Sequence, residues 1–309
     1  MGLLNIFKHP SDSTKINLIR KMTGMSKEEF DEKVKVDENG VYYFGDNTLL
    51  MGADVTTSYY RVKEGTELIV RSAFWGSEVE SITLPESIHT IQKCAFDGAK
   101  KLREINIPYK ISEICEQTFN GCDSLQSITL PETCSAIQKQ AFDNCKLLEK
   151  VCINHDAKND LGSSPKEKCI GEYAFNNCVS LKEVELPEGV VSINDSAFKD
   201  CKALSSIALP SSLESIQTNA FWGCTSLSEL EIPESVKEIH MTAMPPALKR
   251  IHIRAKEMNI AKLAFLKCED IETIIVPQGC KDLYQKIFDG TTGPVKIKIK
   301  KKQLDIQED

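Results

Sequence analysis

The sequence predicts an α/β repeat fold, a solenoid of about nine stacked units of about 23 residues with a cap at each end. Two observations support this prediction. A phenylalanine returns at a nearly constant spacing through most of the chain, and a short strand-like segment, usually ending in proline, lies between successive phenylalanines. Self-similarity at a fixed period of this size is the sequence signature of stacked repeat architectures.

The repeated phenylalanines define the units. Each follows an alanine, except that Phe119 follows Thr118, and Met244 takes the place of one phenylalanine. An isoleucine lies five residues before each of these positions, as Ile69 lies before Phe74. The full set comprises Phe74, Phe96, Phe119, Phe142, Phe175, Phe198, Phe221, Met244 and Phe265.

The strand-like segments alternate apolar and polar residues, as in Ile82-Thr83-Leu84-Pro85. This alternation predicts a strand with one buried face, and proline ends the strand because it cannot donate to the ladder. One such strand cannot bury its apolar face alone, whereas stacked copies pair in parallel around a continuous core. Nine rungs at the usual strand spacing predict a rod about 43 Å long.

The unit Leu-x-x-Ile-x-Leu-Pro-x-x-Val-x-x-Ile-x-x-x-Ala-Phe-x-x-Cys resembles the BspA-like class of leucine-rich repeats over about residues 60 to 280. The resemblance implies a leucine-rich-repeat solenoid with a parallel β-sheet on its concave side. Members of this class are often bacterial or protist surface proteins that bind host or partner proteins. The resemblance therefore implies protein binding or adhesion at an exported or cell-surface location, and it carries no catalytic residues.

The two ends are expected to be caps, because the end rungs of a solenoid would otherwise expose their core. Residues 1–59 are predicted to form the N-terminal cap, residues 60–280 the solenoid, and residues 281–309 the C-terminal cap. In the N-terminal cap, Ser26 to Glu29 form a capping box that begins a helix reaching about Val34, and Asn39-Gly40 predicts a hairpin turn. A small docking module is the alternative to a simple cap.

The C-terminal cap is expected to contain a helix and an edge strand. The helix carries apolar residues at helical spacing, and the strand alternates apolar residues with lysines that discourage sheet-to-sheet pairing. An anionic contact site is the alternative interpretation of those lysines. The helix residues are Leu283, Tyr284, Ile287 and Phe288, and the strand residues are Val295, Ile297 and Ile299 with Lys296, Lys298 and Lys300.

One unit carries a ten-residue insertion, since Ile170 follows Asn154 by 16 residues where six are usual. The polar composition of the insertion predicts a surface loop at the rim of the solenoid, and such loops often contact ligands. A loop without function is the alternative. The candidate contact residues are His155, Asp156, Asn159 and Asp160.

The cysteines indicate packing, not chemistry. Six of the twelve share one position, three residues after the repeated phenylalanine, where other units have serine or alanine. A small buried residue fits this position, and reduced cysteine behaves as one. Neither C-x-x-C pairs nor nearby histidines are present, so we expect no metal and no cofactor. This usage and the lack of a visible signal peptide favour a cytoplasmic location.

Several function classes are disfavoured. The net charge of -7 argues against nucleic acid, and no apolar run is long enough for membrane insertion. The nucleophile-elbow, P-loop and dinucleotide motifs are absent, so we expect no enzyme. The pair Glu183 and Glu185 resembles the two carboxylates of a glycoside hydrolase, but it recurs as Glu229 and Glu231 and so marks a surface property of the repeat.

The outward strand residues form the candidate binding surface on the concave face. They are neutral in the first rungs, acidic in the middle and basic afterwards, which predicts a protein partner with a basic surface. Plain solubility is the alternative, and carbohydrate is disfavoured because no aromatic row faces outward. An intracellular scaffold or regulator using the same surface is the alternative to adhesion. The candidates are Glu183, Glu185, Glu229, Glu231, Arg250, His252, Thr83, Asn106 and Thr129.

Overall fold

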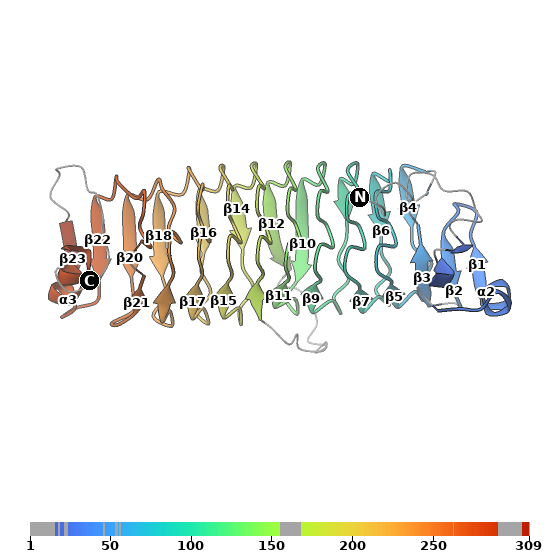
Figure 1. Cartoon of the computed structure of the whole chain (residues 1–309), viewed down its shortest axis with the longest axis horizontal. Helices are drawn as coiled ribbons and strands as arrows, with labels where there is room; N and C mark the ends of the chain where they lie inside the picture. The colour runs from blue at the N-terminus through green and yellow to red at the C-terminus, as the bar shows by residue number, and fades with distance from the viewer. Residues whose placement is uncertain are drawn as a thin grey trace.

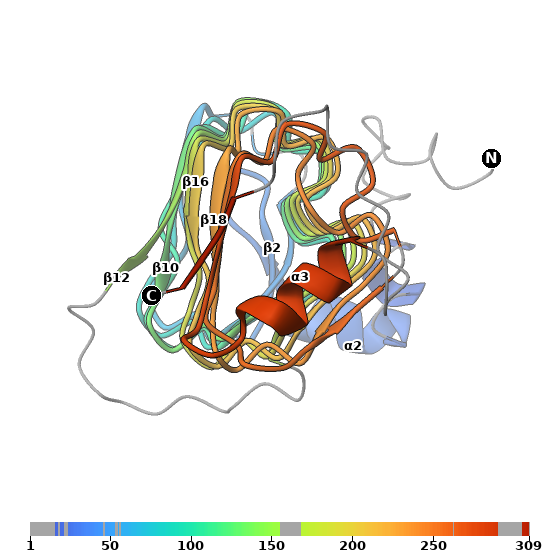
Figure 2. The ribbon, with the colours of Figure 1, turned by 90° about the vertical axis from the view of Figure 1, so that its left-hand side faces the viewer.

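The structure is a computed structural model that describes residues 16–17, 19–21, 24–45, 47–52, 55, 57–154, 168–261, 263–289 and 305–308. Figure 1 shows an elongated rod of stacked turns, running from helix α2 (Lys27–Lys33) at one end to helix α3 (Lys281–Asp289) at the other. The predicted repeat solenoid is confirmed. Each turn contributes two short strands, and the turns superimpose when the rod is viewed along its axis (Figure 2).

The longer strands of successive turns share one side of the rod, which we call the long-strand face (Figure 2). Neighbouring strands of the solenoid pair in parallel, so that equivalent residues face each other, as Val151 faces Val184. The strands of this face are β4 (Tyr59–Arg61), β6 (Ser81–Thr83), β8 (Glu104–Ile105), β10 (Ser127–Pro131), β12 (Lys150–Asn154), β14 (Glu183–Glu185), β16 (Ser206–Ala208), β18 (Glu229–Ile232), β20 (Arg250–Ile253), β22 (Thr273–Val276) and β23 (Asp305–Glu308).

The two-residue strands form a second parallel ribbon, which we call the short-strand face. Its residues pair in the same in-register way, as Ile193 pairs with Ile216. Its strands are β5 (Leu68–Ile69), β7 (Thr90–Ile91), β9 (Glu113–Ile114), β11 (Ala136–Ile137), β13 (Cys169–Ile170), β15 (Ser192–Ile193), β17 (Ser215–Ile216), β19 (Glu238–Ile239) and β21 (Asn259–Ile260).

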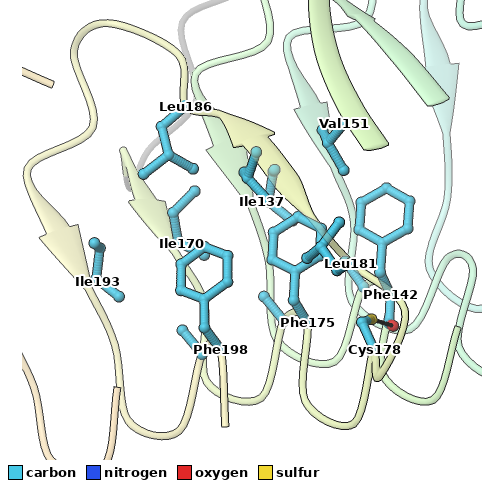
Figure 3. Close-up of a cluster of buried hydrophobic side chains, with 14 of the residues drawn as sticks. Ile137, Phe142, Val151, Ile170, Phe175, Cys178, Leu181, Leu186, Ile193 and Phe198 are labelled. Atoms are coloured by element: carbon cyan, nitrogen blue, oxygen red, sulfur yellow. Dashed lines mark hydrogen bonds between the residues drawn. The ribbon is translucent and has the colours of Figure 1, made fainter. Parts of the chain in front are cut away.

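The core contains a continuous column of stacked phenylalanine rings. From Phe74 to Phe221 the ring centroids of successive units lie 5.1 to 5.5 Å apart, and their planes differ by at most 11°. Figure 3 shows three of these rings, each surrounded by the isoleucines and leucines of its own and neighbouring turns. Met244 is fully buried at the position of the missing ring. The sequence repeat is therefore the repeat of this column.

From Phe74 to Phe221, the turn that carries each phenylalanine has two residues in the left-handed region. They lie two residues before and two residues after the ring, as Gln140 (φ 55) and Asn144 (φ 61) flank Phe142. The second position holds glycine, asparagine or aspartate in seven units: Gly76, Gly98, Gly121, Asn144, Asn177, Asp200 and Gly223. These residue types adopt positive φ at the lowest cost, which explains why the turn tolerates only them in most units.

All twelve cysteines are free thiols, and the six at the repeated position are buried as predicted. Each of those six donates to a backbone carbonyl of the preceding turn, as Cys178 Sγ does to Phe142 O at 3.1 Å (Figure 3) and Cys201 Sγ does to Phe175 O at 3.0 Å. Burial raises the pKa of the Cys201 thiol well above its ordinary value. These thiols therefore act as packing groups and weak hydrogen-bond donors.

The N-terminal region extends the short-strand face. The predicted capping box is present: Ser26 Oγ accepts from the Glu29 backbone amide at 3.1 Å, and the Glu29 carboxylate accepts from the Ser26 amide at 3.1 Å. The predicted hairpin joins the antiparallel strands β1 (Val34–Val36) and β2 (Tyr42–Phe44). Strand β3 (Thr48–Met51) pairs antiparallel with β2 and parallel with β5, which links the hairpin to the first turn of the solenoid.

The C-terminal helix α3 covers the last turn. Tyr284 and Phe288 are buried, the Tyr284 hydroxyl donates to Ala255 O at 2.7 Å, and the Phe288 ring meets Phe265 edge-on at 5.3 Å. The predicted strand at residues 295–300 lies outside the described residues. Strand β23, which the sequence did not predict, pairs in parallel with β22 and continues the long-strand face.

Removing one ring from the middle of the column should destabilise the whole stack. We expect Phe175→Ala to lower the free energy of unfolding by about 3–5 kcal/mol, because it deletes a fully buried aromatic side chain. Leu147→Ala is the control, since half of Leu147 is exposed, and it should change stability by less than about 0.5 kcal/mol. Urea unfolding followed by circular dichroism measures both variants. Equal losses would contradict a core organised around the rings.

Candidate functional site

The nine predicted strand residues lie on the long-strand face, where each strand presents alternate side chains outward. Register places them in two columns. Glu185 lies beside Ala208, and Glu231 lies beside His252, in the middle column that also holds Thr83, Asn106 and Thr129. Glu183, Glu229 and Arg250 share the column two residues earlier. The structure therefore brings the predicted residues onto one surface.

Two hollows interrupt the long-strand face, and the sequence did not predict them. The smaller, of about 550 Å³, lies over β6, β8 and β10 and includes Thr83, Asn106 and Thr129. The larger, of about 920 Å³, lies over β12, β14 and β16 with part of β18, and it includes Glu183, Glu185 and Glu231. Six of the nine predicted strand residues thus line one of these hollows.

The hollows coincide with local departures from the repeat. Within the described residues, no ladder of backbone hydrogen bonds joins β8 to β10 or β16 to β18. On one side of each seam, in the rungs of β8 and β16, the inward strand residues are only partly buried, whereas their counterparts on the other side, in β10 and β18, are buried. The partly buried residues are Ile105 and Ile107 beside the first seam, and Ile207 and Leu209 beside the second. A hollow therefore forms where the sheet closes less tightly.

Asn106 is a predicted contact residue whose side chain supports the sheet. Its Nδ2 donates to Leu84 O at 2.8 Å, and its Oδ1 accepts from the Leu84 amide at 2.7 Å. The carboxamide thereby provides the two bonds that a neighbouring strand would give, at the point where β8 ends. This role depends on which residue of the preceding rung lies beside Asn106. The sequence pattern within one unit therefore could not predict it.

Three of the four predicted glutamates form ion pairs with cations that the sequence analysis did not pair with them. Lys150 Nζ lies 3.0 Å from Glu183, Arg250 lies 3.5 Å from Glu229, and Arg254 Nε donates to Glu231 at 3.0 Å. These cations come from neighbouring rungs, and the side chains are about half exposed. Exposed pairs of this kind contribute little to stability, so a partner's cation is able to compete for the carboxylates.

The two remaining members of the predicted basic and acidic sets are less exposed. Glu185 Oε2 accepts from the Ile153 amide at 3.0 Å, which places it in the same supporting role toward β12 that Asn106 has toward β6. His252 Nδ1 lies 3.9 Å from Glu231, and only 18% of the His252 side chain is exposed. His252 therefore belongs to the edge of the acidic cluster and not to a separate basic surface.

The larger hollow also contains residues that the sequence analysis omitted. Glu188 adds a carboxylate, Lys150 adds a cation, and Cys152, Ser206 and Ala208 provide small side chains. A signal for Glu188 was present, because it follows Pro187 directly, and Glu86 and Tyr109 follow their strand prolines in the same way and line the smaller hollow. The residue after the strand proline is thus a third outward column.

The predicted rim residues His155, Asp156, Asn159 and Asp160 lie outside the described residues. Among the residues that the structure does describe, no group of three His, Cys, Asp or Glu side chains is placed to hold a metal ion. No helix in the described part of the chain is long and apolar enough to cross a membrane.

The sequence matches the family model for the BspA type leucine rich repeat region over residues 67–164 and 168–305, which is most of the chain. This protein belongs to that family. The match begins at the turn of the first stacked ring and extends to β23, so the BspA-type region includes both hollows of the long-strand face.

Several solved structures are similar to this BspA-type chain. A leucine-rich repeat protein from Bacteroides ovatus is 21% identical, with 89% of this chain and 75% of that chain covered and a TM-score of 0.48. The T. pallidum leucine-rich repeat protein is 24% identical, with 66% and 90% covered and a TM-score of 0.49. The pneumococcal vaccine antigen PcpA is 23% identical, with 87% and 82% covered and a TM-score of 0.40. No curated protein matches the chain.

Outward residues that bond to the backbone of a neighbouring rung should contribute more to stability than outward residues that do not. We expect Asn106→Ala to lower the free energy of unfolding by about 1–3 kcal/mol, because it leaves the Leu84 amide and carbonyl without the side chain that pairs with both. Thr129→Ala, at the same position one rung later, should be nearly neutral. Thermal or urea unfolding checks both, and an Asn106 variant as stable as the Thr129 variant would refute the supporting role.

Proposed function

We propose that this BspA-type protein is a non-catalytic binding protein that recognises a basic surface of another protein through the long-strand face, in adhesion or partner recognition. One observation carries the proposal: the larger hollow, of about 920 Å³, is open on that face and lined by four glutamates and one lysine. The glutamates are Glu183, Glu185, Glu188 and Glu231. Opposite charge on a partner gives such a surface both specificity and fast association.

The architecture supports binding because the strands hold the site before a partner arrives. Backbone ladders join β12, β14 and β16, so their outward side chains are already ordered and lose little conformational entropy on binding. Two properties of the glutamates argue against catalysis. The Glu183 and Glu185 pair recurs as Glu229 and Glu231, and Glu183, Glu229 and Glu231 each lie beside a cationic side chain of a neighbouring rung.

A second candidate function is an intracellular scaffold or regulator that uses the same face. The observation that favours it is the twelve free cysteines, most of them buried, which suit a reducing compartment. Fractionation of the producing cells separates the two candidates: a cytoplasmic protein favours the scaffold, and an exported protein favours adhesion.

The binding face is tested with charge-neutralising variants. The partner is first isolated on the immobilised wild-type protein, and its affinity is then measured for a variant with Glu183, Glu185, Glu229 and Glu231 replaced by glutamine. We expect binding to weaken by at least about tenfold, because central charges of an interface control affinity. Glutamine keeps the acceptor oxygen and nearly the same volume, so the fold should be unchanged by circular dichroism.

The matched control makes the same change of net charge elsewhere. Glu113, Glu116, Glu172 and Glu238 lie on the short-strand ribbon or its adjoining turns, and their replacement by glutamine should leave affinity unchanged. Equal affinity of both variants, with loss of binding only on deletion of residues 155–167, would overturn the proposed face and assign recognition to the insertion.

A further inference from the structure

The larger hollow includes a gap above Ala208. In the middle column of the long-strand face, Ala208 lies beside Glu185 of β14, and Glu231 occupies the equivalent place on β18. The Ala208 side chain is exposed and consists of a single methyl group. Because neighbouring rungs lie about 4.8 Å apart, Glu185 and Glu231 stand one rung away from Ala208 on either side, with a single methyl group between them.

The floor of this space is apolar. Ile207 and Leu209 are only partly buried and line the hollow together with Ala208, because the sheet is interrupted between β16 and β18. Glu188 closes one end, where Ser211 Oγ donates to its carboxylate at 3.2 Å. In the structure, the Glu185 carboxylate accepts from the Ile153 amide of β12, and the Glu231 carboxylate accepts from Arg254 of the β20 rung. A cation above Ala208 would meet both carboxylates after rotation of these two side chains. An apolar floor between glutamates that can reach over it suits a long aliphatic stem that ends in a cation.

We propose that the space above Ala208 is a socket for one arginine side chain of the partner protein. The three methylenes of arginine would lie against Ala208, Ile207 and Leu209, and the guanidinium would meet Glu185, Glu188 and Glu231. Arginine is favoured over lysine because its planar group offers five donors in fixed directions, enough for carboxylates on more than one side. This inference rests on the proposed function, since it names the chemistry recognised at the same hollow.

Two described cations pair with glutamates of the hollow, and both come from other rungs than β16. Lys150 and Arg254 approach from the two flanking sides, 3.0 Å from Glu183 and 3.0 Å from Glu231 respectively. Neither residue belongs to β16. The described space above Ala208 is part of the hollow. These flanking pairs are half exposed, so their exchange for a partner's guanidinium costs little.

The socket is tested on the isolated chain with a small probe. The protein is labelled with ¹³C at its alanine methyl groups, and the Ala208 resonance is identified as the one absent from the Ala208→Ser variant. The probe is acetyl-Gly-Arg-Gly-amide, and the matched control peptide carries citrulline, a neutral isostere, in place of arginine. We expect the arginine peptide to shift the Ala208 methyl resonance saturably and the citrulline peptide to leave it in place.

Two further readouts separate the socket from general charge attraction. The buried Ala220 methyl should not move, and the Glu185→Gln, Glu231→Gln double variant should weaken the arginine-dependent shift by at least about tenfold. The shift should also diminish as salt rises, because the hollow is open to solvent. An Ala208 resonance that ignores the arginine peptide, or that responds equally to citrulline, would overturn the socket.

Failure of the socket and failure of the proposed function are distinguishable. If the arginine peptide does not bind but the isolated partner still loses affinity for the four-glutamine variant, the socket is wrong and the face is right. If the partner ignores that variant, the proposed function is wrong, whatever the peptide does at Ala208.

Discussion

The stacked phenylalanine rings set the geometry on which the rest of this structure depends. Ring centroids 5.1 to 5.5 Å apart are close to the spacing of paired strands, about 4.8 Å, so one ring per turn fills the core without breaking either strand ribbon. The left-handed residues on each side of the ring bend the turn around it. At the two ends, the Tyr60 ring contacts Phe74 at a tilt and the Phe288 ring meets Phe265 edge-on, so aromatic contacts of a different geometry close the core.

A core of this kind leaves most outward residues outside the packed interior, and the proposed binding function depends on them. Each outward position recurs once per rung, so the outward side chains form regular columns. A substitution in one unit changes one side chain of a column and leaves its neighbours in position. The hollows show that the array also depends on small defects. Where β16 fails to pair with β18, Ile207 and Leu209 become accessible and the surface recedes. The candidate site is thus a local departure from the repeat, bordered by carboxylates that the regular turns hold in place.

The fold could be predicted from the sequence because its determinants recur within each unit. The ring position, the strand segment, the buried cysteine position and the Ser26 capping box each have a local signal, and all are present. The site could be predicted only as far as a column of outward residues. The role of Asn106, the pairing of Lys150 with Glu183 and the gap above Ala208 depend on which side chains meet across rungs and on where pairing stops. Those properties belong to neighbouring units together, and no single unit encodes them.

The most direct test of this account is carboxyl footprinting of the complex with the isolated partner. A carbodiimide and a labelled amine modify accessible carboxylates, and mass spectrometry compares each glutamate in the free and bound protein. The account predicts protection of Glu183, Glu185, Glu188 and Glu231, which line the larger hollow, with no change at Glu113 and Glu238 on the short-strand face. Protection confined to the short-strand face, with the four hollow glutamates labelled as in the free protein, would contradict it.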